Sequence, residues 1–106
     1  MKYPVKRSGK FTVLSLNGEV DLNCSPDARK QILKYLNNNE YLLVDMSDVE
    51  YIDSSGVASL VEGFQLSRGL KLDFALVGVS RPAMQVLELA KLDKIFPIHA
   101  SIDDCL

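Results

Sequence analysis

The sequence lacks the features that mark several large classes of protein. It has no tryptophan and one histidine, and its longest apolar runs, YLLV and FALVGV, are far too short to cross a bilayer. The opening residues MKYPVKRSGKF carry positive charges, but no apolar segment of signal-peptide length follows them. We therefore expect a cytoplasmic protein without a membrane partner.

Cysteine is also scarce. Cys24 and Cys105 lie far apart in the sequence and fit no metal-binding spacing. A disulfide between them would be unusual in a reducing compartment. We expect two free thiols, no metal site and no cofactor.

Neither sign of charge dominates, since 12 basic and 14 acidic residues leave a net charge of −2. No basic stripe is interleaved with aromatic residues, so nucleic acid is not an expected partner. The composition, 47% apolar and 25% charged, is ordinary for a soluble globular protein. The length of 106 residues predicts one domain, residues 1–106.

The first half of the chain contains two strand-like segments and one helix-like segment. Residues 11–16, FTVLSL, alternate in hydrophobicity and end at Asn17 and Gly18, a strong turn signal. Residues 2–7 are compatible with a short edge strand that tolerates Pro4. Ser25 is then predicted to cap a helix that stops at the asparagines of residues 37–39.

The second half continues the alternation. Residues 41–46, YLLVDM, predict a central strand that is covered on both faces. A helix over 57–67 follows, and Gly69 is predicted to end it. A strand at 71–79, a helix capped by Ser80 and a short strand at 95–99 come next. The apolar stripes of these two helices are Val57, Leu60, Val61 and Phe64, then Ala83, Val86, Leu87 and Ala90.

The predicted order is β-β-α-β-α-β-α-β. Ser101 starts a last helix that is truncated at Leu106. Strands that alternate with helices indicate an α/β domain with a mixed, mostly parallel sheet, right-handed crossovers and helices packed on the sheet.

The stretch VEYIDSSGVASLVEGF, residues 49–64, places three polar residues and a glycine where strand gives way to helix. One interpretation is a helix N-cap, with Gly56 allowing a tight turn. One cap residue suffices for the roughly 1 kcal/mol that such a cap contributes, so three polar residues exceed the need.

A second interpretation is an enzyme in which Ser54 or Ser55 is a nucleophile, with an aspartate and His99 as partners. The nucleophile-elbow signature G-x-S-x-G is absent, however, and His99 is the only histidine of the sequence.

A third interpretation is regulatory, with one serine as a phosphate acceptor. A helix N-terminus tolerates a phosphate while the added charge changes the surface. Asp53, with Asp21 from a neighbouring loop, would oppose that charge. A partner docked on Val57, Ala58 and Val61 would have to desolvate it.

Three segments carry a resemblance to a known family: LNGEVDLNCSPDARKQI, VDMSDVEYIDSSGVASLVEGF and FALVGVSRPAMQVLELAKLDKIFPIHASIDDCL. Together they resemble, in order and over nearly the whole chain, the STAS-domain anti-sigma factor antagonists of the SpoIIAA type. The resemblance implies a STAS-like fold. It also implies that Ser54, directly after Asp53, is the phosphate acceptor and that Ser55 is its helix-capping neighbour.

The resemblance further implies a bacterial partner switch that regulates transcription. The unphosphorylated antagonist binds an anti-sigma factor that is also a serine kinase, is phosphorylated and released, and is reset by a PP2C-type phosphatase. Such a phosphoprotein is not an enzyme. The expected partner-binding residues are Asp21, Asp53, Ser55, Gly56, Val57, Ala58 and Val61.

Two departures and one alternative accompany this expectation. GVASLVEGF is less glycine-rich than the common GLG helix start, which bears on partner specificity. The short last helix either weakens the domain or leaves an edge for self-association as a weak homodimer. The alternative is a STAS accessory subunit of a lipid or solvent-tolerance transport system, which is not phosphorylated. The intact Asp-Ser-Ser-Gly favours the switch, and neighbouring kinase or transporter genes would separate the two.

Overall fold

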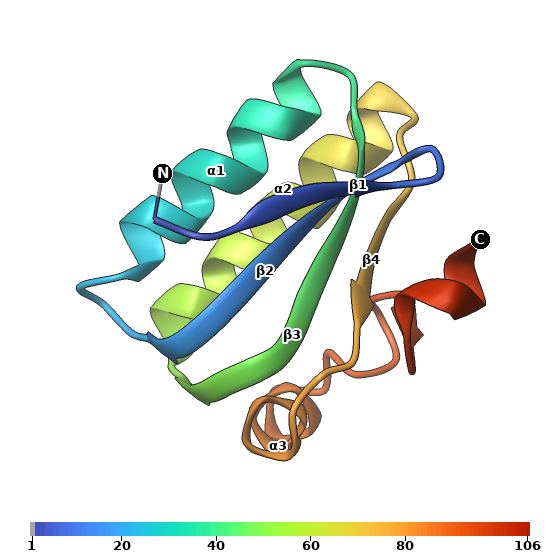
Figure 1. The fold of residues 1–106 in the computed structure, drawn as a ribbon. Helices are drawn as coiled ribbons and strands as arrows, with labels where there is room; N and C mark the ends of the chain where they lie inside the picture. The colour runs from blue at the N-terminus through green and yellow to red at the C-terminus, as the bar shows by residue number, and fades with distance from the viewer. Residues whose placement is uncertain (1) are drawn as a thin grey trace.

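The computed structural model describes residues 2–106, in which strands and helices alternate (Figure 1). In chain order they are β1 (Val5–Ser8), β2 (Phe11–Val20), α1 (Ser25–Asn37), β3 (Tyr41–Ile52), α2 (Ser54–Leu70), β4 (Phe74–Val77), α3 (Arg81–Leu89), β5 (Ile98–His99) and the 3-10 helix η1 (Ile102–Cys105). The predicted order is confirmed, with a single 3-10 turn in place of the truncated last helix. Among these helices none is long and apolar enough to cross a membrane.

The strands of residues 2–106 form one five-stranded sheet in the order β1-β2-β3-β4-β5. β1 runs antiparallel to β2, and the other neighbours are parallel. The predicted mixed, mostly parallel sheet is therefore confirmed. Leu14, Val44 and Leu76 lie opposite one another across β2, β3 and β4, so their side chains share one face of the sheet.

Both faces of the central strands are covered. The first face packs with the helices into the main core, whose buried residues include Leu14, Leu16, Ile32, Leu36, Val44, Met46, Leu60, Leu76 and Leu87. The second face carries a smaller cluster, Phe11, Val13, Leu43, Ala75 and Val77, against which Ile102 and Cys105 of η1 pack. Figure 1 shows α1 and α2 on one side of the sheet and η1 on the other. The prediction that residues 41–46 are covered on both faces is confirmed.

The predicted turn at Asn17 and Gly18 is wrong. β2 continues through both residues to Val20, with register shifts on either side of them, and Gly18 has a φ of 66°. Glycine tolerates this left-handed conformation, which a bulge in a strand requires. The longer β2 stays paired with β3, which extends to Ile52, six residues past its predicted end.

Helix ends also differ from the sequence prediction. Ser25 is not the cap of α1, because Cys24 holds that position and Ser25 is buried inside the helix. Gly69 does not end α2, which runs to Leu70 before Lys71 adopts the left-handed conformation. Ser80 does cap α3 as predicted, since its Oγ accepts the N–H of Ala83 at 3.3 Å.

Most strand limits are narrower than the patterns suggested. β4 is confined to Phe74–Val77 and β5 to Ile98–His99, inside the predicted segments 71–79 and 95–99. The edge strand β1 lies at Val5–Ser8, directly after Pro4. Cys24 and Cys105 are free thiols.

The residues before β1 are held against α1 by one buried side chain. The Gln31 carboxamide accepts the backbone N–H of Tyr3 at 2.9 Å and donates to the Tyr3 carbonyl at 3.0 Å. The Tyr3 ring is 2% exposed, and its hydroxyl lacks a hydrogen-bond partner among the described residues. Burial is the main reason that the pKa of Tyr3 is raised to about 12.

Candidate functional site

Asp53 is the residue that caps α2. Its Oδ1 accepts the backbone N–H groups of Ser55 at 2.9 Å and of Gly56 at 3.1 Å, which have no partner inside the helix. The sequence alone left Asp53, Ser54 and Ser55 as candidate caps, and the structure selects the aspartate. Asparagine and aspartate are among the strongest N-cap residues because their short side chains reach these N–H groups.

Ser55 supports this cap and does not replace it. Its hydroxyl donates a hydrogen bond to Asp53 Oδ1 at 2.5 Å, the same oxygen that accepts the backbone N–H groups. The capping role that the family resemblance implied for Ser55 is therefore an indirect one. A hydroxyl committed to a carboxylate in this way is less available to a partner.

The pKa of Asp53 is lowered, and the hydroxyl of Ser55 is the largest cause. Backbone N–H groups of Gly56, Ser55 and Leu22 act in the same direction, since each stabilises the charged form. Asp53 is therefore ionised at neutral pH. It places a negative charge one residue before Ser54.

Ser54 is the first residue of α2, and its side chain is exposed. Within residues 2–106, Ser54 Oγ makes no hydrogen bond, in contrast to the hydroxyl of Ser55. The two adjacent serines thus differ in environment. Ser54 presents a free hydroxyl to solvent at a helix N-terminus, where a phosphate is well tolerated.

Gly56 is buried, and its role is close packing. A Cβ at this position would lie 2.6 Å from the carbonyl oxygen of Val20 and 2.7 Å from Ile52 Cγ1. Gly56 does not adopt a positive φ, so the expected requirement for a tight turn at this glycine is wrong. The missing side chain lets the first turn of α2 rest directly on the ends of β2 and β3, which positions Asp53 and Ser54.

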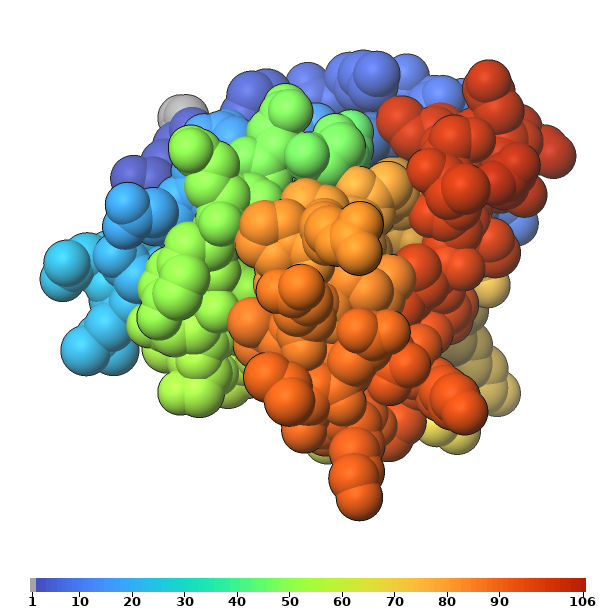
Figure 2. All heavy atoms as spheres, turned by 90° about the horizontal axis from the view of Figure 1, so that it is seen from below, coloured from blue at the N-terminus to red at the C-terminus, as the bar shows by residue number. Residues whose placement is uncertain are grey.

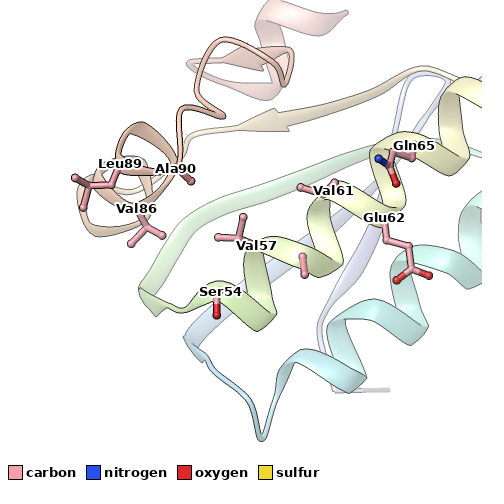
Figure 3. A pocket seen from close by; sticks show the side chains of 9 residues that line it. Ser54, Val57, Val61, Glu62, Gln65, Val86, Leu89 and Ala90 are labelled. Atoms are coloured by element: carbon pink, nitrogen blue, oxygen red, sulfur yellow. The ribbon is translucent and has the colours of Figure 1, made fainter.

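An open groove runs from Ser54 along α2, between α2 and α3 (Figure 3). Its volume is about 720 Å³. It is lined from α2 by Ser54, Val57, Ala58, Val61, Glu62 and Gln65, and from α3 and its C-cap by Val86, Leu89 and Ala90. We call these residues the α2–α3 groove. Ser54 and Gln65 stand at opposite ends of it in Figure 3.

The apolar residues of α2 divide between the core and this groove. Leu60 is buried, in keeping with its place in the apolar stripe, and Ala58, expected to contact a partner, is exposed. Phe64, expected to be buried, is half-buried and packs against Phe74 and Phe96. Val57 is largely buried and still lines the groove.

The α3 side of the groove was missed by sequence reasoning. Val86 and Ala90 were assigned to the core stripe of the third helix, but Val86 is half-buried and Ala90 is exposed. Leu89 lies outside that stripe and is 85% exposed. A leucine off the apolar stripe was the one available signal, and it does not by itself indicate which helix lies alongside.

The loop between β2 and α1 borders the other side of Ser54. Asp21 turns toward its own loop, where Oδ1 accepts the N–H groups of Asn23 and Cys24 at 3.0 and 3.1 Å. Leu22 exposes 73% of its surface, and its backbone N–H helps to lower the pKa of Asp53. Figure 2 shows the green residues around the start of α2 between this light-blue loop and the orange α3.

The arrangement gives no support to a serine nucleophile activated by histidine. His99 lies in β5, where it pairs with Val77 of β4, and it lines a separate hollow with Phe11 and Cys105. Ser54 lines the α2–α3 groove instead. Among residues 2–106 there is also no group of three or more His, Cys, Asp or Glu side chains suited to a metal ion.

A comparison with known protein families finds that a STAS domain model matches residues 2–105. The chain belongs to the STAS domain family. The resemblance seen in the sequence is confirmed.

Individual relatives extend this comparison. The anti-sigma F factor antagonist of Paenibacillus polymyxa is 25% identical over 89 residues, which cover 82% of this chain and 76% of that protein. The crystal structure of TM1081 from Thermotoga maritima is 27% identical, with a TM-score of 0.88 over 97% of this STAS chain and 90% of that chain. The unphosphorylated form of SpoIIAA is 16% identical, with a TM-score of 0.79 over 97% and 91% of the two chains, and it shows the fold alone.

Proposed function

We propose that this STAS domain is an anti-sigma factor antagonist in a phosphorylation-controlled partner switch. It binds an anti-sigma factor that is also a serine kinase, and phosphorylation of Ser54 releases it. A PP2C-type phosphatase returns it to the binding form. The similarity to the anti-sigma F factor antagonist of Paenibacillus polymyxa supports this role.

The observation that carries the proposal is the different environment of the two serines. The hydroxyl of Ser55 is bound to Asp53, whereas Ser54 is exposed at the N-terminus of α2 and at the end of an apolar groove. A kinase that reaches Ser54 must therefore also cover the neighbouring surface. The proposed contact surface consists of residues 18–23, residues 53–56 and the exposed side of α2, with Asp21, Val57, Ala58 and Val61.

The sign of the switch follows from charge. A phosphate on Ser54 adds nearly two negative charges beside the ionised Asp53. If a carboxylate of the partner lies about 6 Å from this phosphate, the repulsion between its single charge and the two charges of the phosphate is roughly 1.4 to 5.5 kcal/mol for effective dielectrics of about 80 to 20. This repulsion weakens binding about ten- to ten-thousand-fold when the partner presents a carboxylate there or cannot solvate the phosphate.

The test uses the anti-sigma factor kinases of the source organism, each purified separately and incubated with the chain and ATP. Intact mass and site mapping should place one phosphate on Ser54 in the wild type and in Ser55→Ala, and none in Ser54→Ala. Calorimetric titration should then show weaker binding by the phosphorylated chain than by the unmodified one. Ser54→Asp should weaken binding only in part, because a carboxylate carries less charge than a phosphate.

Three results would count against the proposal. Phosphate on Ser54→Ala but not on Ser55→Ala would identify the other serine as the acceptor. Equal or tighter binding by the phosphorylated form would reverse the switch. A chain that no kinase binds or modifies would instead fit the accessory-subunit alternative.

A further inference from the structure

The α2–α3 groove is apolar along its length and polar at its ends and edge. Its apolar lining is Val57, Ala58 and Val61 from α2 and Val86, Leu89 and Ala90 from α3 and its C-cap, while Ser54, Glu62 and Gln65 supply its polar groups. In Figure 3 Val57 lies opposite Val86. Leu89 projects almost fully into solvent, at 85% exposed. Apolar surface that is contiguous and rimmed by polar residues is typical of a binding site.

The dimensions of the groove match a helix of the partner. Ser54 and Gln65 are eleven residues apart on α2, which at about 1.5 Å per residue is roughly 16 Å, or three helical turns. The groove is open, so an elongated segment can lie along it. Its walls are two helices, and an amphipathic helix commonly fills such a groove with residues at i, i+3 or i+4, and i+7.

The charges along the groove indicate the flanks of that helix. No lysine or arginine is among the described residues that line it. Glu62 is held by Arg29 through both carboxylate oxygens, at 2.7 Å each, so its charge is largely matched. Glu88 does not line the groove itself; it borders a neighbouring hollow with Gln85 and Leu89, next to the groove, and has no ion pair with the described residues. A basic residue on the partner is therefore complementary to Glu88.

Continuity with the phosphorylation site selects the partner. Ser54 forms one end of the groove, so the anti-sigma factor kinase that must reach its hydroxyl is already in place over the groove. We propose that the α2–α3 groove binds an amphipathic helix of the anti-sigma partner, with apolar residues on Leu89 and Ala58 and a lysine or arginine near Glu88. This inference rests on the proposed function. It adds α3 to the contact surface.

The first experiment compares two exposed apolar residues. Leu89→Asp introduces a charge into the groove, whereas Ile95→Asp introduces the same charge at a 56% exposed residue that does not line it. Leu89→Asp should weaken kinase binding by about tenfold or more, as for a contact residue at the centre of an interface. Ile95→Asp should change it by no more than about twofold, and thermal unfolding should show both variants folded.

The second experiment needs no natural partner. Two synthetic amphipathic peptides of about 14 residues, or four helical turns, carry leucines on one face and either lysines or glutamates on the other. The leucine–lysine peptide should shift the amide NMR signals of α2 and α3, and Leu89→Asp should abolish these shifts. The leucine–glutamate peptide should bind more weakly.

The outcomes separate the two proposals. If a kinase binds and phosphorylates the wild type, and Leu89→Asp binds as tightly as Ile95→Asp, the groove is not the docking site and the switch still stands. If no kinase binds or modifies the wild type, both proposals fall. If the lysine peptide shifts signals outside α2 and α3, or the glutamate peptide binds more tightly, the proposed occupant is wrong.

Discussion

Gly56 offers the sharpest test of how the first turn of α2 is positioned. In Gly56→Ala, the new Cβ would lie 2.6 Å from the backbone carbonyl oxygen of Val20 and 2.7 Å from Ile52 Cγ1. Neither contact is tolerable, and the carbonyl belongs to a strand paired with β3, so it has little freedom to move. The helix start must therefore shift away from the sheet.

The expected magnitude is the balance of two effects. Overpacking of this kind destabilises by about 1 to 3 kcal/mol. Alanine regains at most about 1 kcal/mol of helix propensity, and less in a first turn. We expect a net loss of roughly 1 to 2 kcal/mol from these two contributions.

Gly69→Ala is the matched control, because it is the same substitution in the same helix. No atom lies within 4 Å of a Cβ at residue 69. Here the propensity gain acts alone, and Gly69→Ala should stabilise by about 0.5 to 1 kcal/mol. Urea unfolding followed by circular dichroism should give a lower midpoint than the wild type for Gly56→Ala and a higher one for Gly69→Ala.

An equal or raised midpoint for Gly56→Ala would refute the reasoning, because it would mean that α2 does not rest on β2 at this glycine. A lowered midpoint for both variants would show that the higher helix propensity of alanine does not stabilise Gly69→Ala as expected. Since Asp53 and Ser54 are carried by the same turn, Gly56→Ala should also slow phosphorylation of Ser54 by the kinase.

Three further predictions concern single side chains. Asp53→Ala should lower the free energy of unfolding by about 1 kcal/mol at neutral pH through loss of the helix cap. Because the pKa of Asp53 is lowered on folding, its contribution to stability is complete above the unfolded pKa of about 4 and is lost as the pH falls through the folded value. Urea titrations at several pH values should therefore show the stability difference between Asp53→Ala and wild type shrinking in acid. A stability difference that does not change with pH would contradict the cap. Ala58→Arg should weaken kinase binding in calorimetry while changing stability by less than about 1 kcal/mol, and a larger loss would place Ala58 in the core. Gln31→Ala should destabilise the fold by about 1 to 3 kcal/mol, because it leaves the buried backbone groups of Tyr3 unpaired. If the variant unfolds at the same temperature as the wild type, the hydrogen bonds between Gln31 and Tyr3 are not needed for stability.

Local patterns in the sequence determined the order of elements and the general form of the fold. The apolar run of residues 41–46 predicted a strand covered on both faces, since such a strand has no solvent-facing positions to be filled with polar residues. Ser80 predicted the start of α3, because capping depends on a side chain and the backbone three residues away. The Asp-Ser-Ser-Gly motif located the candidate site for the same reason: its chemistry is contained in adjacent residues.

Sequence reasoning failed where a distant segment competed with a local signal. Asn17 and Gly18 have the chemistry of a turn, but pairing with β3 keeps them in the strand as a bulge. Ser25 has the chemistry of a cap, but Asp21 already holds the loop that precedes α1. In both cases an interaction with another segment or within the loop outweighs the local preference of the residue for a turn or a cap, and for a cap that preference is worth about 1 kcal/mol.

The arrangement of the site was decided by tertiary structure. The motif itself did not say which of the two adjacent serines has a free hydroxyl; only the geometry of the folded capping turn places Ser55, and not Ser54, within reach of the Asp53 carboxylate. The need for glycine at residue 56 comes from the carbonyl of Val20, which is far away in the sequence. The α2–α3 groove exists because α3 packs on β3 near α2 and leaves an open hollow that residues of both helices line, and no periodicity within either helix specifies which neighbour it will have.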